Sequence, residues 1–152
     1  MQYKLILLDV DGTLYSHTTK SIPESTIKAL KIVQSKGIKI GIASGRSKLV
    51  TAFTGILDIL DFDFFVTTNG NLVIDKFDNV IYSNPMNQKG IDMVLDLIDK
   101  YELNATFMTL DDFYIYRDID ERAHLGFDPL SIPLPYKKEY KKENIYQINL
   151  FC

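Results

Sequence analysis

The chain has 152 residues, of which 46% are hydrophobic and 24% are charged, so it can bury a sizeable core in the ordinary manner of globular proteins. The net charge of -3 offers no basic surface for nucleic acid, and no apolar run is long enough to cross a bilayer. Its one cysteine, Cys152, excludes a disulfide within the chain, and we find no signal peptide, so we expect a cytoplasmic protein.

The first predicted element is a strand over residues 4–8, whose apolar side chains run without alternation. Such a run indicates a strand covered on both faces, as in the middle of a parallel α/β sheet. Asp9 and Asp11 follow it directly. Ligands bind at the carboxyl ends of the strands in such sheets, and alternate residues of an extended segment share a face. We therefore expect both carboxylates to point into one cleft.

A polar loop over residues 15–22 precedes a helix that begins near Pro23 and ends at Gly37. The second strand is predicted over residues 38–43, and this order of strand, helix and strand predicts a right-handed parallel crossover. The helix is expected to bury Ala29, Leu30 and Val33. A further helix, capped by Ser47, is expected to turn inward the side chains of Leu49, Val50, Phe53 and Leu57.

Polar residues also follow the next two strands. The second strand ends in Ser44, Gly45 and Arg46, and a third strand over residues 62–67 is followed by Asn69 and a glycine. Three successive strands therefore finish in polar, glycine-containing turns. This is the pattern of a sheet that gathers its chemistry at one edge.

The pattern changes near Asn71. We predict a hairpin over residues 72–83, a helix over residues 88–101 and short strands after it, at residues 105–110, 113–117 and 144–151. Residues 118–135 are poorly patterned and contain three prolines. Because these elements are antiparallel in character, we place a domain boundary near Asn71, where a second, α+β unit begins.

The two aspartates suit the chemistry of phosphoryl transfer. Mg²⁺ prefers oxygen ligands and keeps several waters, so Asp9 and Asp11 could hold it. One carboxylate can attack phosphorus to form an acyl phosphate, while the other protonates the leaving oxygen and later takes a proton from water. Two solvated acids in a turn are the alternative, but a buried strand before the motif favours the functional interpretation.

Three segments together resemble one family. Residues 9–14 read DVDGTL and resemble motif I of the haloacid dehalogenase-like phosphohydrolases. Residues 43–46, ASGR, resemble the second motif of their Cof-type, sugar phosphatase-like branch, and residues 67–73, TTNGNLV, resemble the turn that leaves its core for its cap. The resemblance implies an α/β fold: a Rossmann-like parallel sheet core over residues 1–70 with an inserted α+β cap over residues 71–152, both partial here.

The resemblance also implies roles for single residues. Asp9 would be the nucleophile and a Mg²⁺ ligand, and Asp11 the general acid/base that gives the metal its backbone carbonyl. The residues implied around the substrate and its phosphate are Gly12, Thr13, Ser44, Gly45, Arg46 and Asn69. A helix-capping role for Ser44 and a solvated surface position for Arg46 remain the alternatives.

Two downstream features of the family are not found: a lysine that balances charge and an acidic metal-binding loop. Without further strands, residues 5–8 would also form a bare apolar edge. We therefore expect the N-terminal portion of a longer protein, or a chain that self-associates or is completed by another chain. Hydrolysis of a small phosphorylated metabolite should then be weak in this chain alone.

Two other functions are possible from the sequence. A non-catalytic binding module could pair with another chain through the open sheet edge or the cap. A phosphoacceptor domain of the response-regulator kind would also join acids to Mg²⁺, but its acceptor follows the third strand, where this chain has Thr67, Thr68 and Asn69. The phosphohydrolase is the leading hypothesis.

Overall fold

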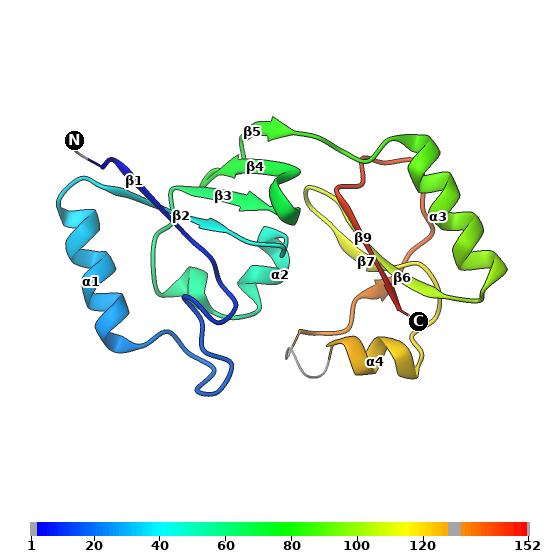
Figure 1. Cartoon of the computed structure of the whole chain (residues 1–152), viewed down its shortest axis with the longest axis horizontal. Coiled ribbons are helices and arrows are strands. Elements are labelled where there is room, and N and C mark those ends of the chain that lie inside the picture. The colour runs from blue at the N-terminus through cyan, green and yellow to red at the C-terminus, as the bar shows by residue number, and fades with distance from the viewer. Residues whose placement is uncertain (1–2, 128–131, 152) are drawn as a thin grey trace. The chain divides into compact units, whose positions relative to one another are not determined.

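The computed structural model describes residues 3–127 and 132–151. The chain divides into two compact units, Met1–Ser83 and Asn84–Cys152. The first unit contains a five-stranded sheet and the second a four-stranded sheet (Figure 1). None of the helices in the described ranges is long and apolar enough to cross a membrane.

The elements of the first unit alternate between strands and helices as the sequence predicts. They are β1 (Leu5–Leu8), α1 (Glu24–Ser35), β2 (Lys39–Ala43), α2 (Lys48–Ala52), β3 (Phe64–Thr67), β4 (Leu72–Asp75) and β5 (Val80–Ser83), with 3-10 turns at Ile56–Asp58 and Thr68–Gly70. The strand order is β1-β2-β3-β4-β5. β1, β2 and β3 are parallel to one another. β4 is antiparallel to β3, and β5 is antiparallel to β4. The α/β fold class and the parallel crossover are confirmed.

Burial in the first unit follows the position of each strand and the length of each helix. Ile40 and Ile42 of β2 are fully buried, because β2 has a strand on each side. In α1 only Leu30 of the predicted stripe is buried, while Val33 is half-buried and Ala29 is exposed. The expectation for α2 is also partly wrong. Val50 is buried, but Leu49 and Phe53 are exposed and Leu57 is half-buried. The helix ends at Ala52, so Phe53 and Leu57 lie beyond it and do not continue its periodicity.

The first strand is not covered on both faces, so that prediction is wrong. Leu5 is 43% and Leu7 46% exposed, and they alternate with the half-buried Ile6 and Leu8. The physical reason is that β1 lies at the edge of the sheet, where β2 is its only neighbour among the described residues. The bare apolar edge that the sequence predicts in the absence of further strands is therefore present.

The hairpin of β4 and β5 belongs to the first sheet. β4 pairs with β3, with Val66 opposite Val73, and the Thr67 hydroxyl donates a hydrogen bond to the Leu72 carbonyl at 3.1 Å. The first compact unit therefore runs to Ser83, and the boundary expected near Asn71 lies inside it. The antiparallel pattern marks a reversal of the chain within the sheet rather than the start of a new unit.

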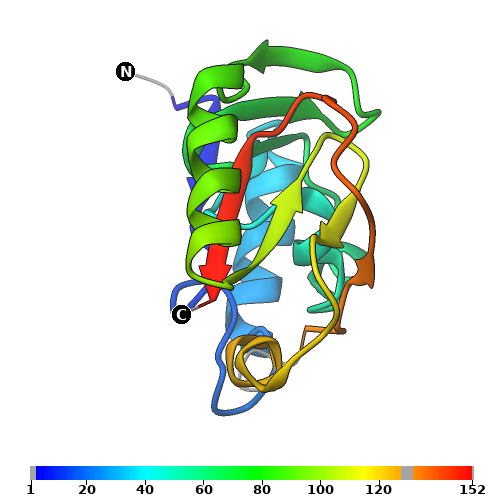
Figure 2. The ribbon, with the colours of Figure 1, turned by 90° about the vertical axis from the view of Figure 1, so that its right-hand side faces the viewer.

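The second unit consists of α3 (Gln88–Lys100), β6 (Asn104–Met108), β7 (Phe113–Ile115), α4 (Glu121–Phe127), β8 (Tyr136–Lys137) and β9 (Gln147–Phe151). The strand order is β8-β7-β6-β9, and α3 lies along the sheet (Figure 2). Ile91 and Ile98 of α3 pack against Ala105, Phe107 and Tyr114 in a buried core. The predicted helix and strands are confirmed.

The helix α4 lies in the segment for which the sequence predicts little structure, so that prediction is wrong over residues 121–127. Asp120 accepts a hydrogen bond from the Ala123 backbone N–H at 3.0 Å, and Glu121 lies in the first turn. An aspartate before a helix with an acid in its first turn is the usual start signal. The three prolines of this segment come after residue 127 in the sequence, and Pro129 lies outside the described residues.

Candidate active site

A cleft of about 390 Å³ lies at the carboxyl ends of the three parallel strands. Asp9 follows β1, Ser44 and Gly45 follow β2, and Asn69 lies in the turn after β3. These four line the cleft with Ala43, Val66 and Gly70. The structure therefore brings together polar residues that are up to 60 positions apart in the sequence, as the strand-end pattern predicts.

The turn that carries Asp9 is held by short-range hydrogen bonds. The Thr13 hydroxyl donates to Asp9 Oδ2 at 3.0 Å, and the Leu14 N–H donates to the Asp9 carbonyl at 3.1 Å. Gly12 has a φ of 78° and its N–H donates to the Tyr15 carbonyl at 3.0 Å. Glycine suits this position, because a residue with a Cβ is strained at positive φ. The turn thus fixes the backbone around an exposed carboxylate.

Asp11 does not line the cleft with Asp9. Its carboxylate instead accepts hydrogen bonds from Arg46, from Nε to Oδ2 at 2.8 Å and from Nη2 to Oδ1 at 2.7 Å. His17 Nε2 lies 2.8 Å from the same Oδ1. Asp11 is therefore not among the residues that line the Asp9 cleft, and two basic side chains hold its carboxylate.

The environment of Asp11 favours its ionised form. Burial raises the pKa of this carboxyl, but the hydrogen bonds and positive charge of Arg46, with a further contribution from His17, outweigh burial and leave the pKa below its usual value. The Arg46 side chain is only 9% exposed, whereas the Asp11 side chain is 37% exposed, so water screens the pair from the side of Asp11. Asp11 is therefore a carboxylate, ready to accept a proton rather than to donate one.

The residues after β2 are shaped for contact with a small group. The Ser44 hydroxyl accepts a hydrogen bond from the Arg46 backbone N–H at 3.1 Å, which leaves its own proton to donate. A Cβ on Gly45 would lie 3.1 Å from the Asn69 side chain, so glycine permits the close approach of that amide. The helix-capping alternative for Ser44 is not needed, because Ser47 caps α2 by accepting from Val50 N–H at 3.2 Å.

The turn after β3 is strained. Thr68, Asn69 and Gly70 have successive φ values of 49°, 57° and 88°, and positive φ is rare for a β-branched residue. At the two residues other than glycine such backbone costs about 1–3 kcal/mol each, and it persists where neighbours enforce it. Here Thr68 N–H donates to the Arg46 carbonyl at 3.2 Å and Asn69 N–H to Ser44 at 3.4 Å. These hydrogen bonds therefore hold Asn69 in the lining of the cleft despite the strain.

The sequence therefore anticipates part of this arrangement. The structure brings together Asp9, Ser44, Gly45 and Asn69, and leaves out of the cleft lining Asp11, Gly12, Thr13 and Arg46. Arg46 is neither a solvated surface residue nor part of the lining, since it is buried against Asp11. His17, which contacts Asp11, lies outside the three motifs and was not predicted as a site residue. Its only signal in the sequence is a histidine in the short polar loop after the acidic pair.

The side chains at the cleft could supply some, but not all, of the oxygen ligands that Mg²⁺ needs. Within the described ranges there is no group of three or more His, Cys, Asp or Glu side chains that could hold a metal. Mg²⁺ needs fewer, because it is commonly held by one or two carboxylates together with waters and substrate phosphate. Asp9 supplies an exposed carboxylate at the cleft, with Thr13 bonded to only one of its oxygens.

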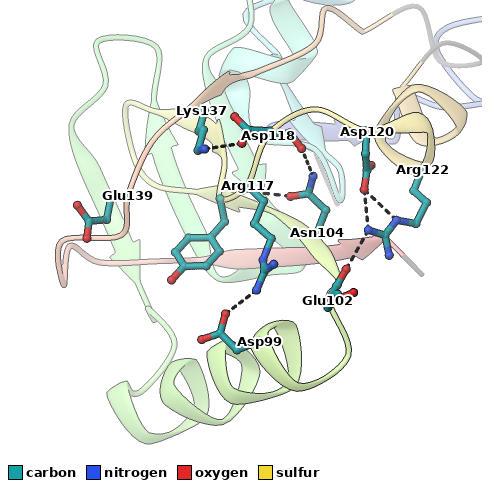
Figure 3. A pocket seen from close by; sticks show the side chains of 10 residues that line it. Asp99, Glu102, Asn104, Arg117, Asp118, Asp120, Arg122, Lys137 and Glu139 are labelled. Atoms are coloured by element: carbon teal, nitrogen blue, oxygen red, sulfur yellow. Dashed lines mark hydrogen bonds and ion pairs between the residues drawn. The ribbon is translucent and has the colours of Figure 1, made fainter.

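A second cleft, of about 700 Å³, lies within the second unit (Figure 3). Its basic side chains are already paired with acids: Arg117 Nη2 lies 2.7 Å from Asp99 Oδ1, and Lys137 Nζ lies 2.8 Å from Asp118 Oδ2. Arg122 is likewise paired with Asp120. Because these charges neutralise one another, the size of this cleft does not make it the better candidate for phosphate chemistry.

Comparison with known proteins agrees with the motifs. A family model described as haloacid dehalogenase-like hydrolase matches residues 6–152. The Bacillus subtilis protein named "Putative phosphatase YkrA" is 35% identical over all of this chain. A hypothetical protein from Geobacillus kaustophilus superposes with a TM-score of 0.85 over 99% of the chain at 27% identity, and the subclass IIB sugar phosphatase BT4131 with 0.79 over 97% at 25% identity.

The three parallel strands, the aspartate that follows β1 and the family match agree on one class of protein. The chain belongs to the haloacid dehalogenase-like hydrolases. It spans 58% of the length of each of the three relatives described above.

Proposed function

We propose that this chain carries the nucleophile of a Mg²⁺-dependent phosphohydrolase that acts on small, sugar phosphate-like metabolites. The observation that supports it best is the exposed Asp9 carboxylate at the end of a parallel strand, in one cleft with the Ser44 hydroxyl and the Asn69 amide. The sugar phosphatase among the solved relatives supports the substrate class. In this proposal the first compact unit, Met1–Ser83, belongs to the core, and the second unit, Asn84–Cys152, begins the cap.

The reaction would proceed in two displacements. An Asp9 carboxylate oxygen attacks phosphorus and the bond to the leaving oxygen breaks. Asp11, which is ionised in the free chain, must first take up a proton, and it then gives that proton to the leaving oxygen. Water then attacks the aspartyl-phosphate and loses its proton to Asp11, which frees phosphate and restores both acids. Ser44, with its hydroxyl proton, would donate to a phosphoryl oxygen. Gly12 and Thr13 maintain the turn.

Asp9, with the backbone carbonyl of Asp11, would hold Mg²⁺. The ion would supply positive charge against the phosphoryl oxygens and so reduce repulsion between two anions. Too few groups in the described residues share this task, and we therefore propose that turnover is slow. The ionised state of Asp11 matches the second displacement, where it accepts a proton.

Hydrolysis of p-nitrophenyl phosphate tests this function. We expect slow release of p-nitrophenol in the presence of Mg²⁺ and release at the uncatalysed rate once EDTA removes the ion, since carboxylates alone repel the dianion. Restoring Mg²⁺ should restore the rate. A rate that EDTA leaves unchanged would contradict the metal requirement, and no release above the buffer rate with Mg²⁺ would contradict activity in this chain.

A second candidate function is a binding module that pairs through the β1 edge, with another copy or a complementing chain. The exposed Leu5 and Leu7 on an edge strand favour it, because unpaired apolar edges invite further strands.

Replacing Leu7 by Lys tests this second candidate by size exclusion with light scattering. We expect the wild-type chain to self-associate and Leu7→Lys to shift toward the monomer, because a charge on the edge opposes strand pairing. Ile32→Lys, on the exposed face of α1, is the matched control and should leave association unchanged. A wild-type chain that is a well-folded monomer would count against pairing with itself.

A further inference from the structure

His17 lies in a short, ordered loop. Ser16 and Ser21 form a bridge in which each N–H donates to the carbonyl of the other, at 3.0 and 3.3 Å. Within the loop, Thr19 N–H donates to the Ser16 hydroxyl at 3.3 Å and the Ser21 hydroxyl donates to that of Thr19 at 3.0 Å. These bonds fix the backbone on both sides of His17, so its imidazole has a defined place.

The imidazole is also held from the side. Its ring meets the ring of Tyr15 edge to face, with centroids 5.5 Å apart, and Tyr15 itself is buried. Tyr15 in turn is tied to the turn of the acidic pair, since its N–H donates to Val10 at 2.8 Å and its carbonyl accepts from Gly12 at 3.0 Å. The loop thus packs His17 against the turn that carries Asp11.

Two separate segments therefore restrain one carboxylate. Arg46 donates to both oxygens of Asp11 from the buried side, and His17 approaches Oδ1 at 2.8 Å from the loop. A bidentate guanidinium fixes the plane of a carboxylate. A further donor from another segment restricts how far that carboxylate can swing with its own side-chain torsions. His17 does not line the cleft, so any effect on a bound phosphate would pass through Asp11.

We propose that His17 is a positioning residue that, together with Arg46, fixes the orientation of the Asp11 carboxylate. The proposal rests on the proposed function, in which Asp11 exchanges a proton with the leaving oxygen and with water. Proton transfer needs contact at hydrogen-bond distance, and a misplacement of about 1 Å can cost about 100-fold in rate. Loss of one restraint of two should therefore lower kcat by about tenfold and change KM little.

The test compares His17→Ala with His17→Gln, whose amide N–H can replace the donor, and with Thr18→Ala as the matched control in the same exposed loop. Crystal structures report the orientation of Asp11, and phosphomonoester kinetics with Mg²⁺ report kcat and KM. We expect the Asp11 carboxylate to move or split between orientations in His17→Ala only. We also expect kcat to fall about tenfold in that variant and to recover in His17→Gln.

The two readouts separate this proposal from the function on which it rests. If the wild-type chain shows no hydrolysis, the proposed function fails, while the orientation of Asp11 in His17→Ala still decides whether His17 positions it. An unmoved carboxylate in His17→Ala overturns the proposal whatever the activity. Equal losses of kcat in His17→Ala and His17→Gln, together with lower melting temperatures for both, would show a merely structural role and overturn it too.

Discussion

Replacement of Asp9 by Asn is expected to lower phosphomonoester hydrolysis by about 10³-fold or more, because an amide cannot form the aspartyl-phosphate through which the reaction proceeds. Asn has the same shape and can keep the hydrogen bond from Thr13, so the fold should be unaffected. The comparison is made at saturating Mg²⁺ with p-nitrophenyl phosphate, and the melting temperature of each protein shows that both are folded.

Asp58→Asn provides the matched control for this variant. Asp58 is an exposed aspartate of the same unit, in the 3-10 turn at Ile56–Asp58, and it does not line the cleft. We expect Asp58→Asn to hydrolyse p-nitrophenyl phosphate at the rate of the wild-type chain. Equal rates for Asp9→Asn and the wild-type chain would remove Asp9 from the mechanism, and with it the proposed covalent intermediate.

Replacement of Phe107 by Ala is expected to destabilise the second unit by about 3–5 kcal/mol, the usual cost of removing a buried aromatic side chain. Phe107 is 0% exposed and lies in the centre of the core between α3 and the sheet. Its ring stacks on Tyr114 at 5.5 Å and contacts Tyr116 at 5.6 Å and Tyr140 at 5.8 Å between centroids. No neighbour can fill such a space without losing its own contacts.

Urea unfolding followed by tyrosine fluorescence measures this effect, since three tyrosines surround the ring. Leu125→Ala is the control, because Leu125 is 71% exposed on α4 and its loss should cost within about 0.5 kcal/mol. A cost below about 1 kcal/mol for Phe107→Ala would mean that this core is not packed as the structure has it.

The order of strands and helices could be predicted because local signals set it. Apolar runs, Gly37 after α1 and the Ser47 cap of α2 all act within a few residues. The burial of β1 could not be predicted in the same way, since it depends on which strands lie beside it. An apolar run shows that a strand can be covered, but Leu5 and Leu7 are exposed because no described strand pairs with the outer edge.

The candidate site, like the fold, could be predicted from the sequence only in part. That Asp9, Ser44 and Asn69 meet follows from parallel strands, whose carboxyl ends lie at one edge. The partners of Asp11 could not be derived, because its pair with Arg46 joins residues 35 positions apart and depends on side-chain torsions. The resemblance implies that Arg46 lies among the residues around the substrate and its phosphate, and the structure shows that Arg46 binds Asp11.

The measurement that tests the central claim most directly is the location of a trapped phosphoryl group. The chain is incubated with acetyl phosphate and Mg²⁺, quenched in acid, digested and examined by peptide mass spectrometry. We expect one phosphoryl group on the peptide that contains Asp9, dependent on Mg²⁺ and absent from Asp9→Asn. Phosphorylation on another residue, or the same incorporation in Asp9→Asn, would contradict the account.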